Sequence, residues 1–219
     1  MKLHFSYNLD KDVENVINGS RSVNNKKPTG FQLLFAEKNG DILDAEKISA
    51  FIEEMDVVSG LDMNKEISVV EKRWENIEAV FIDRVEKLFG ISYPSPVIVV
   101  YLTHNERCTY NIEENYFFVK IGSDFSNNII IHELLHFYTL YAFGMKLMNE
   151  GLSKSTYNDI KESLTELLNL EFSDLMGGKP DMGYPQHEGL RAKIRTSWLV
   201  EKNLPVLVEK LVSDHESIP

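Results

Sequence analysis

The stretch IIIHELLH, residues 129–136, says most about the fold and function of this protein. It places His132, Glu133 and His136 in a segment, residues 128–143, whose other side chains are almost all apolar. Burying an ionisable side chain without a partner costs several kcal/mol. The sequence therefore predicts that these three side chains have partners inside the folded protein.

The spacing of the two histidines predicts a metal site. Residues four apart on a helix lie on one face, one turn above the other, so His132 and His136 can both reach one ion. Glu133 follows the first histidine and can act as general base toward a water molecule on that ion, as in the HExxH motif of zinc hydrolases. Zinc takes neutral histidine nitrogens and makes their burial favourable. The alternative is a core helix with two hydrogen-bonded histidines and a salt-bridged glutamate.

The segments around this stretch predict an α+β fold that is mostly helical. Two apolar runs, residues 96–103 and 116–121, predict strands that precede the helix of the motif, which we expect to end at Gly144. Hydrophobic residues at spacings of three and four, together with helix start and stop signals, predict further helices. These helices cover residues 45–58, 65–89, 157–176, 186–200 and 205–213. We expect the small sheet to pack on the helix of the motif.

The polar segment 18–30 predicts a loop or linker near the start of the chain. Residues 1–60 are therefore expected to form an N-terminal lobe of unknown role, and residues 61–219 the metal-binding catalytic domain. The two parts can also belong to one domain, since 219 residues suit either organisation.

A catalytic zinc ion usually has three protein ligands and an open position for water, so a third ligand is needed. The metzincin pattern is absent, because Thr139 and Ala142 stand where that pattern has Gly and His. On the next predicted helix, Glu162 and Glu166 share a polar face that carries no Lys or Arg. Like charges at this spacing destabilise a helix slightly, and a divalent ion relieves the repulsion. Glu162 is the candidate ligand, and the alternative is a solvated polar face.

HELLH followed by KESLTELLN, residues 161–169, resembles the gluzincins, the thermolysin-like clan of zinc metallopeptidases. The likeness covers residues 132–176, and HExxH is its specific motif. It implies a zincin-like fold in which Glu162, 26 positions after His136, completes the metal site. It also implies that Glu166, where the family often has Asp, hydrogen-bonds a ligand histidine.

The resemblance also offers a rival ligand and two catalytic candidates. The stretch LMNEGLSK, residues 147–154, resembles the NEG segment of aminopeptidase-like gluzincins, in which case Glu150 is the third ligand. In the loop DMGYPQHEGLR, residues 181–191, the family likeness implies that Tyr184 or His187 stabilises the oxyanion of the tetrahedral intermediate. The alternative is that both are ordinary loop residues.

Composition argues against several other classes of protein. The chain has 34 acidic and 23 basic residues and a net charge of -11, which disfavours binding to nucleic acid or to an anionic membrane. Its most apolar window, residues 129–143, is too short and too polar for a transmembrane helix. The start lacks the apolar region of a signal peptide, and Cys108 is the only cysteine, so we expect a soluble cytoplasmic protein.

The sequence thus predicts a zinc metallopeptidase that acts on a peptide or protein substrate. His132, His136 and Glu162 would hold Zn²⁺, and Glu133 would move the proton of the attacking water. The alternative is a non-catalytic zincin scaffold that works as a protein-binding module. The intact Glu133 argues against that alternative, because a structural metal site has no use for a general base.

Overall fold

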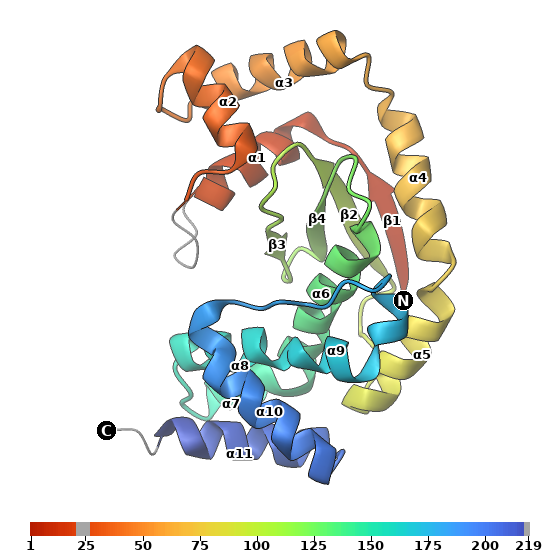
Figure 1. Ribbon diagram of the computed structural model, residues 1–219, viewed down its shortest axis with the longest axis vertical. Coiled ribbons are helices and arrows are strands. Elements are labelled where there is room, and N and C mark those ends of the chain that lie inside the picture. Colours follow the sequence, from red (N-terminus) through yellow and green to blue (C-terminus); the bar gives the residue numbers. More distant parts are fainter. Residues whose placement is uncertain (21–26, 217–219) are drawn as a thin grey trace. The chain divides into compact units, whose positions relative to one another are not determined.

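The computed structural model of the protein describes residues 1–20 and 27–216 (Figure 1). Part of the predicted loop, residues 21–26, lies outside the described residues. The fold is α+β, as the sequence predicts, with many helices and one four-stranded sheet. In the described part of the chain, no helix has the combination of length and hydrophobicity needed to cross a membrane.

The chain divides into two compact units, and each is built from two separate segments. Unit 1 comprises residues 1–76 and 95–129, and unit 2 comprises residues 77–94 and 130–219. The segment 1–60, expected as an N-terminal lobe, is thus one portion of unit 1 and shares that unit with later strands.

Unit 1 contains the sheet, in the strand order β1-β2-β4-β3. The strands are β1 (Lys2–Ser6), β2 (Val97–Thr103), β3 (Tyr110–Asn111) and β4 (Tyr116–Lys120). β1 and β4 both run parallel to β2, and β3 runs antiparallel to β4. The two central strands, β2 and β4, are rich in β-branched and aromatic side chains, which suit a buried pleated surface. Both are predicted from the sequence, whereas β1 and the short β3 are additional to the prediction.

The helices of unit 1 are α1 (Leu9–Ser20), α2 (Gly30–Asn39), α3 (Ala45–Ser59) and α4 (Met63–Glu75). Their ends follow local rules: Thr29 and Gln32 form a capping box at the start of α2, and Asp44 caps α3. Gly60 ends α3 in a left-handed conformation, with φ 64°. The first three helices share an apolar core of Val13, Val16, Phe31, Phe35, Ile48 and Ile52.

In the described residues of unit 2, all regular secondary structure is helical. It holds α5 (Glu78–Phe89), the part of α6 (Ser126–Thr139) from residue 130 onward, the π-helical segment η1 (Leu140–Gly144), α7 (Met145–Asn149), α8 (Lys154–Leu164), α9 (Glu166–Glu171), η2 (Ser173–Leu175), η3 (Pro185–His187), α10 (Glu188–Val200) and α11 (Leu204–Glu216). Aromatic contacts join distant parts of it, such as the Phe81 and Phe172 rings, whose centroids lie 5.3 Å apart. The HELLH residues lie in α6, as predicted, and α6 is buried at Leu134, Leu135 and Phe137.

Two predicted helices are interrupted, and each interruption has a polar side chain beside it. The predicted helix 65–89 is two helices, because α4 ends at Glu75. The side-chain amide of the C-cap residue, Asn76, donates to the carbonyl of Lys72 at 2.9 Å. The predicted helix 157–176 is broken at Thr165, whose hydroxyl donates to the carbonyl of Glu162 at 2.8 Å. The finer expectation of a zincin-like arrangement of sheet and helix stays a prediction.

Candidate metal centre

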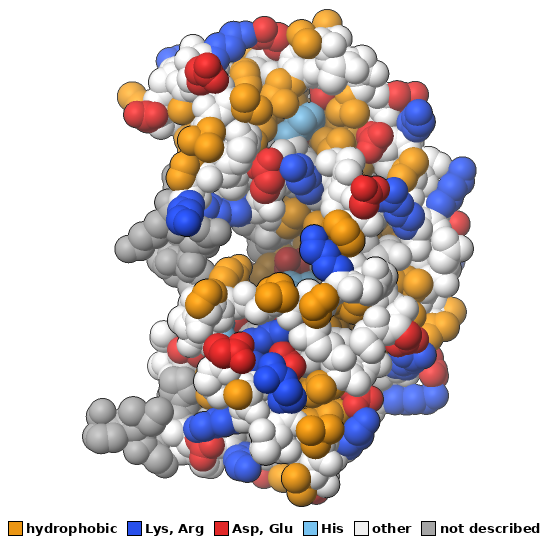
Figure 2. Space-filling view, in the orientation of Figure 1, with side chains coloured by type: hydrophobic (Ala, Val, Ile, Leu, Met, Phe, Trp, Pro, Cys, Tyr) orange, Lys and Arg blue, Asp and Glu red, His pale blue; other side chains and the backbone are white. Residues whose placement is uncertain are grey.

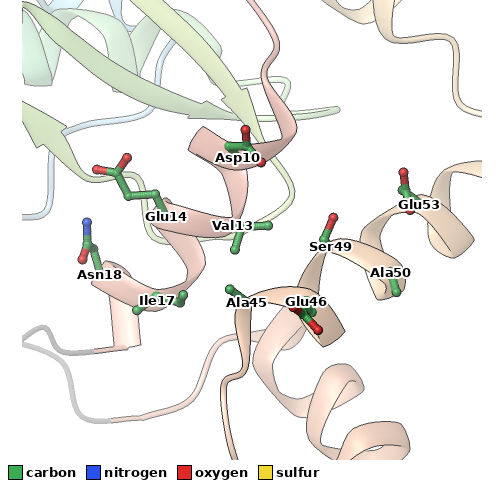
Figure 3. Close-up of a pocket in the computed structure, with 10 residues that line it drawn as sticks. All are labelled: Asp10, Val13, Glu14, Ile17, Asn18, Ala45, Glu46, Ser49, Ala50 and Glu53. Carbon is green, nitrogen blue, oxygen red and sulfur yellow. The ribbon is translucent and has the colours of Figure 1, made fainter.

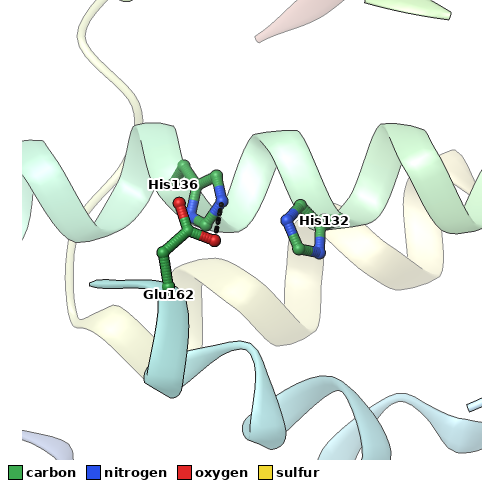
Figure 4. A group of neighbouring side chains, drawn as sticks. All are labelled: His132, His136 and Glu162. Carbon is green, nitrogen blue, oxygen red and sulfur yellow. Dashed lines mark ion pairs between the residues drawn. The ribbon is translucent and has the colours of Figure 1, made fainter. Parts of the chain in front are cut away.

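Two histidines of α6 form one side of the candidate site. His132 and His136 are one turn apart, and their ring centroids lie 4.6 Å from each other with an angle of 82° between the ring planes. The helix places both rings on one face because they are four residues apart (Figure 4). The His136 side chain is 2% exposed, whereas that of His132 is 23% exposed. The face of α6 that carries the motif therefore borders a site that is buried at one end and partly open at the other.

Glu162 reaches the same point from α8. Its Oε2 lies 3.5 Å from Nε2 of His136, the contact dashed in Figure 4. One ligand atom from each of His132, His136 and Glu162 lies within 4.8 Å of the other two. Ligands around a tetrahedral zinc ion are about 3.4 Å apart for bonds near 2.1 Å, so the three side chains must draw closer together to hold an ion. The structure thus brings the three predicted ligands together.

The rival ligand, Glu150, lies elsewhere. It follows the short helix α7, its side chain is 58% exposed, and its carboxylate is 3.9 Å from the ammonium of Lys146. Among the described residues, the group that could hold a metal ion does not include Glu150. The structure therefore favours Glu162 over Glu150.

Asp181, in the loop before η3, orients the first histidine. The Nδ1 of His132 lies 2.7 Å from Oδ2 of Asp181, so it donates to the carboxylate, and Nε2 can face an ion once it has lost its own proton. The other oxygen, Oδ1, lies 2.9 Å from the hydroxyl of Thr165 and accepts from Arg191 at 3.0 Å. Asp181 is thereby fixed from two further directions.

The family resemblance implies that Glu166 hydrogen-bonds one of the two histidines, whereas in the structure Asp181 makes this contact with His132. Glu166 begins α9, and its carboxylate forms an ion pair with Arg191 at 2.8 Å and accepts a hydrogen bond from Arg195 at 2.9 Å, both on α10. Two guanidinium groups thus hold Glu166, while Asp181 contacts His132. Because Arg191 contacts both carboxylates, Glu166 supports Asp181 through that arginine.

The two histidines differ in their affinity for protons. Burial disfavours the charged ring of His132, but the hydrogen bond and charge of Asp181 outweigh it and raise the pKa of His132 to about 9. Burial, followed by the charge of Lys161, lowers the pKa of His136 to about 3. Burial also opposes ionisation of Asp181, yet His132 lowers the pKa of Asp181 to about 2. At neutral pH His136 is therefore already in the neutral form that binds metals.

Glu133 is a buried carboxylate with a raised pKa. Its side chain is buried, and its Oε2 makes no hydrogen bond with the described residues. Burial raises the pKa of Glu133 to about 7, and the negative charge of Glu162 acts in the same direction. A buried carboxylate oxygen without a partner next to three convergent ligands fits a site that holds an ion and a water molecule.

Lys161 also lies in the site, although no pattern in the sequence pointed to it. Its side chain is 4% exposed, and its ammonium lies 2.9 Å from Oε1 of Glu162. Next to a predicted ligand on an amphipathic helix, a lysine looks like an ordinary solvent-facing residue. The signal that could have found it is its position directly after Ile160 and three residues before Leu164, both buried.

The structure places the two oxyanion candidates near α8. His187 is buried, and its Nε2 lies 3.1 Å from Oδ1 of Asp159, which is three residues before Glu162 on that helix. The Tyr184 ring stands edge-on to the ring of His187, with 5.9 Å between the centroids. Both candidates thus lie in one cluster beside the helix of the third ligand.

Two surface pockets of unit 1 are lined by none of the predicted site residues. One, of about 630 Å³, is bordered by α1 and α3 and lined by the acidic residues Asp10, Glu14, Glu46 and Glu53 and by smaller side chains such as Ala45, Ser49 and Ala50 (Figure 3). The other, of about 610 Å³, has apolar walls that include Phe31 and Phe51, and His104 lines it. On the face drawn in Figure 2, acidic, basic and hydrophobic side chains are interspersed. Neither pocket contains a ligand of the candidate metal centre.

Comparison with known proteins does not assign a family or a function to this chain. The chain matches no protein-family model, no curated protein and no solved structure. A function for this protein must therefore be inferred from the site itself.

Proposed function

We propose that this protein is a zinc-dependent hydrolase, and specifically a metallopeptidase that cleaves peptide bonds. The observation that carries the proposal is the convergence of His132, His136 and Glu162 beside the buried Glu133. Two imidazoles and one carboxylate are the protein ligands of a catalytic zinc site with an open position. The resemblance of HELLH and KESLTELLN to the gluzincins supports the choice of a peptide bond.

The ligand atoms follow from the hydrogen bonds. His132 would bind through Nε2, because its Nδ1 donates to Asp181. His136 would bind through Nε2 and Glu162 through Oε2, the two atoms that face each other at 3.5 Å. When bound, zinc supplies Lewis acidity, which polarises a substrate carbonyl group and makes a water molecule acidic near neutral pH.

The remaining residues manage protons and developing charge. With a pKa of about 7, Glu133 accepts a proton from the attacking water and returns it to the leaving amine. Asp181 keeps the ring of His132 in one orientation and one tautomer. Tyr184 and His187 are proposed as donors to the oxyanion of the tetrahedral intermediate.

A comparison of two glutamate variants tests the metal site. The zinc content of purified, zinc-loaded protein is measured by mass spectrometry after loosely held metal has been removed on a chelating resin. We expect about one zinc ion per chain in the wild type and in Glu150→Gln, and a loss of zinc in Glu162→Gln, since only Glu162 lies in the ligand group. A wild type without zinc contradicts the proposed metal site. A loss in Glu150→Gln alone identifies Glu150 as the ligand.

The variant Glu133→Gln tests catalysis separately from metal binding. We expect it to retain zinc and to lose about 10²–10⁴-fold in the rate of cleavage of a mixed fluorogenic peptide library, because it cannot accept a proton. Retained peptidase activity in Glu133→Gln contradicts the role of Glu133. A zinc-loaded wild type that cleaves no peptide in the library favours the non-catalytic protein-binding module instead.

A further inference from the structure

The buried Lys161 gives the candidate site a positive charge of its own. Lysine is rarely buried without a partner, because removing an ammonium group from water costs several kcal/mol. Here the side chain is 4% exposed, and its Nζ lies 2.9 Å from Oε1 of Glu162. Adjacent residues on a helix normally point in different directions, so this pair depends on the packing of α8 and not on helical spacing.

The two oxygens of Glu162 have different neighbours. Oε1 faces the ammonium of Lys161, and Oε2 faces Nε2 of His136 at 3.5 Å. The lysine therefore holds the carboxylate by one oxygen and leaves the other directed toward the histidine. This is the orientation that a ligand bound through Oε2 requires.

We propose that Lys161 is a built-in counter-ion of the metal site, which holds Glu162 in its ligand orientation before an ion binds and weakens the binding of the ion. The inference rests on the proposed metal site. Without a divalent ion, the Lys161 ammonium compensates the buried carboxylate, so the fold of the site does not depend on metal. When a divalent ion binds the same carboxylate, two positive charges lie a few ångströms apart in a buried setting and repel each other.

The site is therefore preformed, and it binds zinc less tightly than the same three ligands would bind it without the lysine. Lys161 is a positioning residue in this scheme, since it acts through Glu162. In this scheme the repulsion between the ammonium and the ion outweighs the gain from positioning Glu162. A lysine that acted only by positioning Glu162 would behave differently, because its loss would weaken zinc binding.

The variant Lys161→Met tests the proposal through the zinc dissociation constant, measured by competition with a chromophoric chelator, and through thermal unfolding with zinc or with EDTA. We expect zinc to bind at least about tenfold more tightly to Lys161→Met than to the wild type, because the repulsion is removed. We also expect a lower melting temperature in EDTA and a larger rise on addition of zinc. The control is Lys154→Met, at the exposed start of α8, which changes the net charge equally. Unchanged or weaker zinc binding by Lys161→Met overturns the proposal.

A double variant covers the case in which Lys161→Met folds poorly. Removing one member of a buried ion pair leaves the other uncompensated, whereas removing both does not. In EDTA, Lys161→Met with Glu162→Gln should therefore melt at a higher temperature than Lys161→Met alone. Equal or lower stability of the double variant shows that Glu162 is not the group that Lys161 compensates, and overturns the inference. A wild type that binds no zinc refutes the proposed function instead. The comparison of the single and double variants in EDTA still tests whether Lys161 compensates Glu162.

Discussion

At the scale of single residues, buried ionisable groups in this protein are held by partners that are distant in sequence. His104, in unit 1, shows this most clearly outside the metal centre. Its Nδ1 lies 2.6 Å from Asp12 and its Nε2 lies 2.9 Å from Asp56. Both ring nitrogens donate only when the ring is protonated. Burial opposes that charge, but the two aspartates outweigh it and raise the pKa of His104.

This arrangement predicts a dependence of stability on pH. The pKa of a histidine in the unfolded chain is about 6.5. A histidine whose pKa is higher in the folded state stabilises the fold fully below about pH 6.5, and this stabilisation is lost as the pH rises through the folded pKa. The groups that face His104 are Asp12 on α1, Asp56 on α3 and Tyr7. The free energy of unfolding is measured with urea from about pH 6, near the pKa of an unfolded histidine, to higher pH. The value for the wild type should fall with rising pH toward the value for Asp56→Asn.

The control for this prediction is His4→Gln, because His4 is exposed on β1. Its unfolding free energy should follow the wild type across the pH range. A constant difference between the wild type and Asp56→Asn at every pH would show that His104 does not titrate in this way.

At the scale of elements, the helix of the motif continues where the sequence predicts an end. Gly144 was expected to terminate it, but Gly144 has a helical φ of -60° and closes the π-helical segment η1, after which α7 continues to Asn149. The glycine is needed for packing. An added Cβ would lie 2.5 Å from Cε2 of Tyr157 on α8, a distance that real contacts do not reach. Gly144 therefore lets α8, which carries Glu162, approach this part of the chain.

We predict that Gly144→Ala destabilises the protein by about 1–3 kcal/mol, because the ring of Tyr157 or the helix must shift. Zinc binding should weaken as well, since α8 carries Glu162. The measurements are urea unfolding and zinc titration. The matched control is Gly189→Ala on α10, where an added Cβ meets no atom within 4 Å and a more stable helix is expected. A Gly144→Ala variant as stable as Gly189→Ala would refute this account.

At the scale of the whole molecule, the chain passes between the two units three times, after residues 76, 94 and 129. The first 60 residues are part of unit 1 because β1 pairs with β2 along five residues, from Lys2 opposite Val97 to Ser6 opposite Tyr101. The helices α1, α2 and α3 complete the apolar core of that unit. Residues 1–60 are thus integral to the fold of unit 1.

Deletion of residues 1–60 should therefore abolish cooperative folding of unit 1. The fragment 61–219 would expose the edge of β2 together with side chains such as Val100 that are buried in the intact protein. We expect aggregation or a broad, non-cooperative thermal transition, measured by size-exclusion chromatography and circular dichroism beside the full chain. A monomeric fragment that melts cooperatively at the temperature of the full chain would instead support a separable N-terminal lobe.

The sequence by itself determined the features that depend on neighbours a few residues apart. Helical spacing put His132 and His136 on one face with Glu133 beside them, and apolar runs identified the two central strands. Only the tertiary structure decided which side chains these histidines meet: Glu162 and not Glu150 lies beside them, Asp181 contacts His132, and Lys161 contacts Glu162. The physical reason is that periodicity fixes which face of a helix a side chain occupies, whereas packing of the other elements decides what that face meets and whether a charge is buried there.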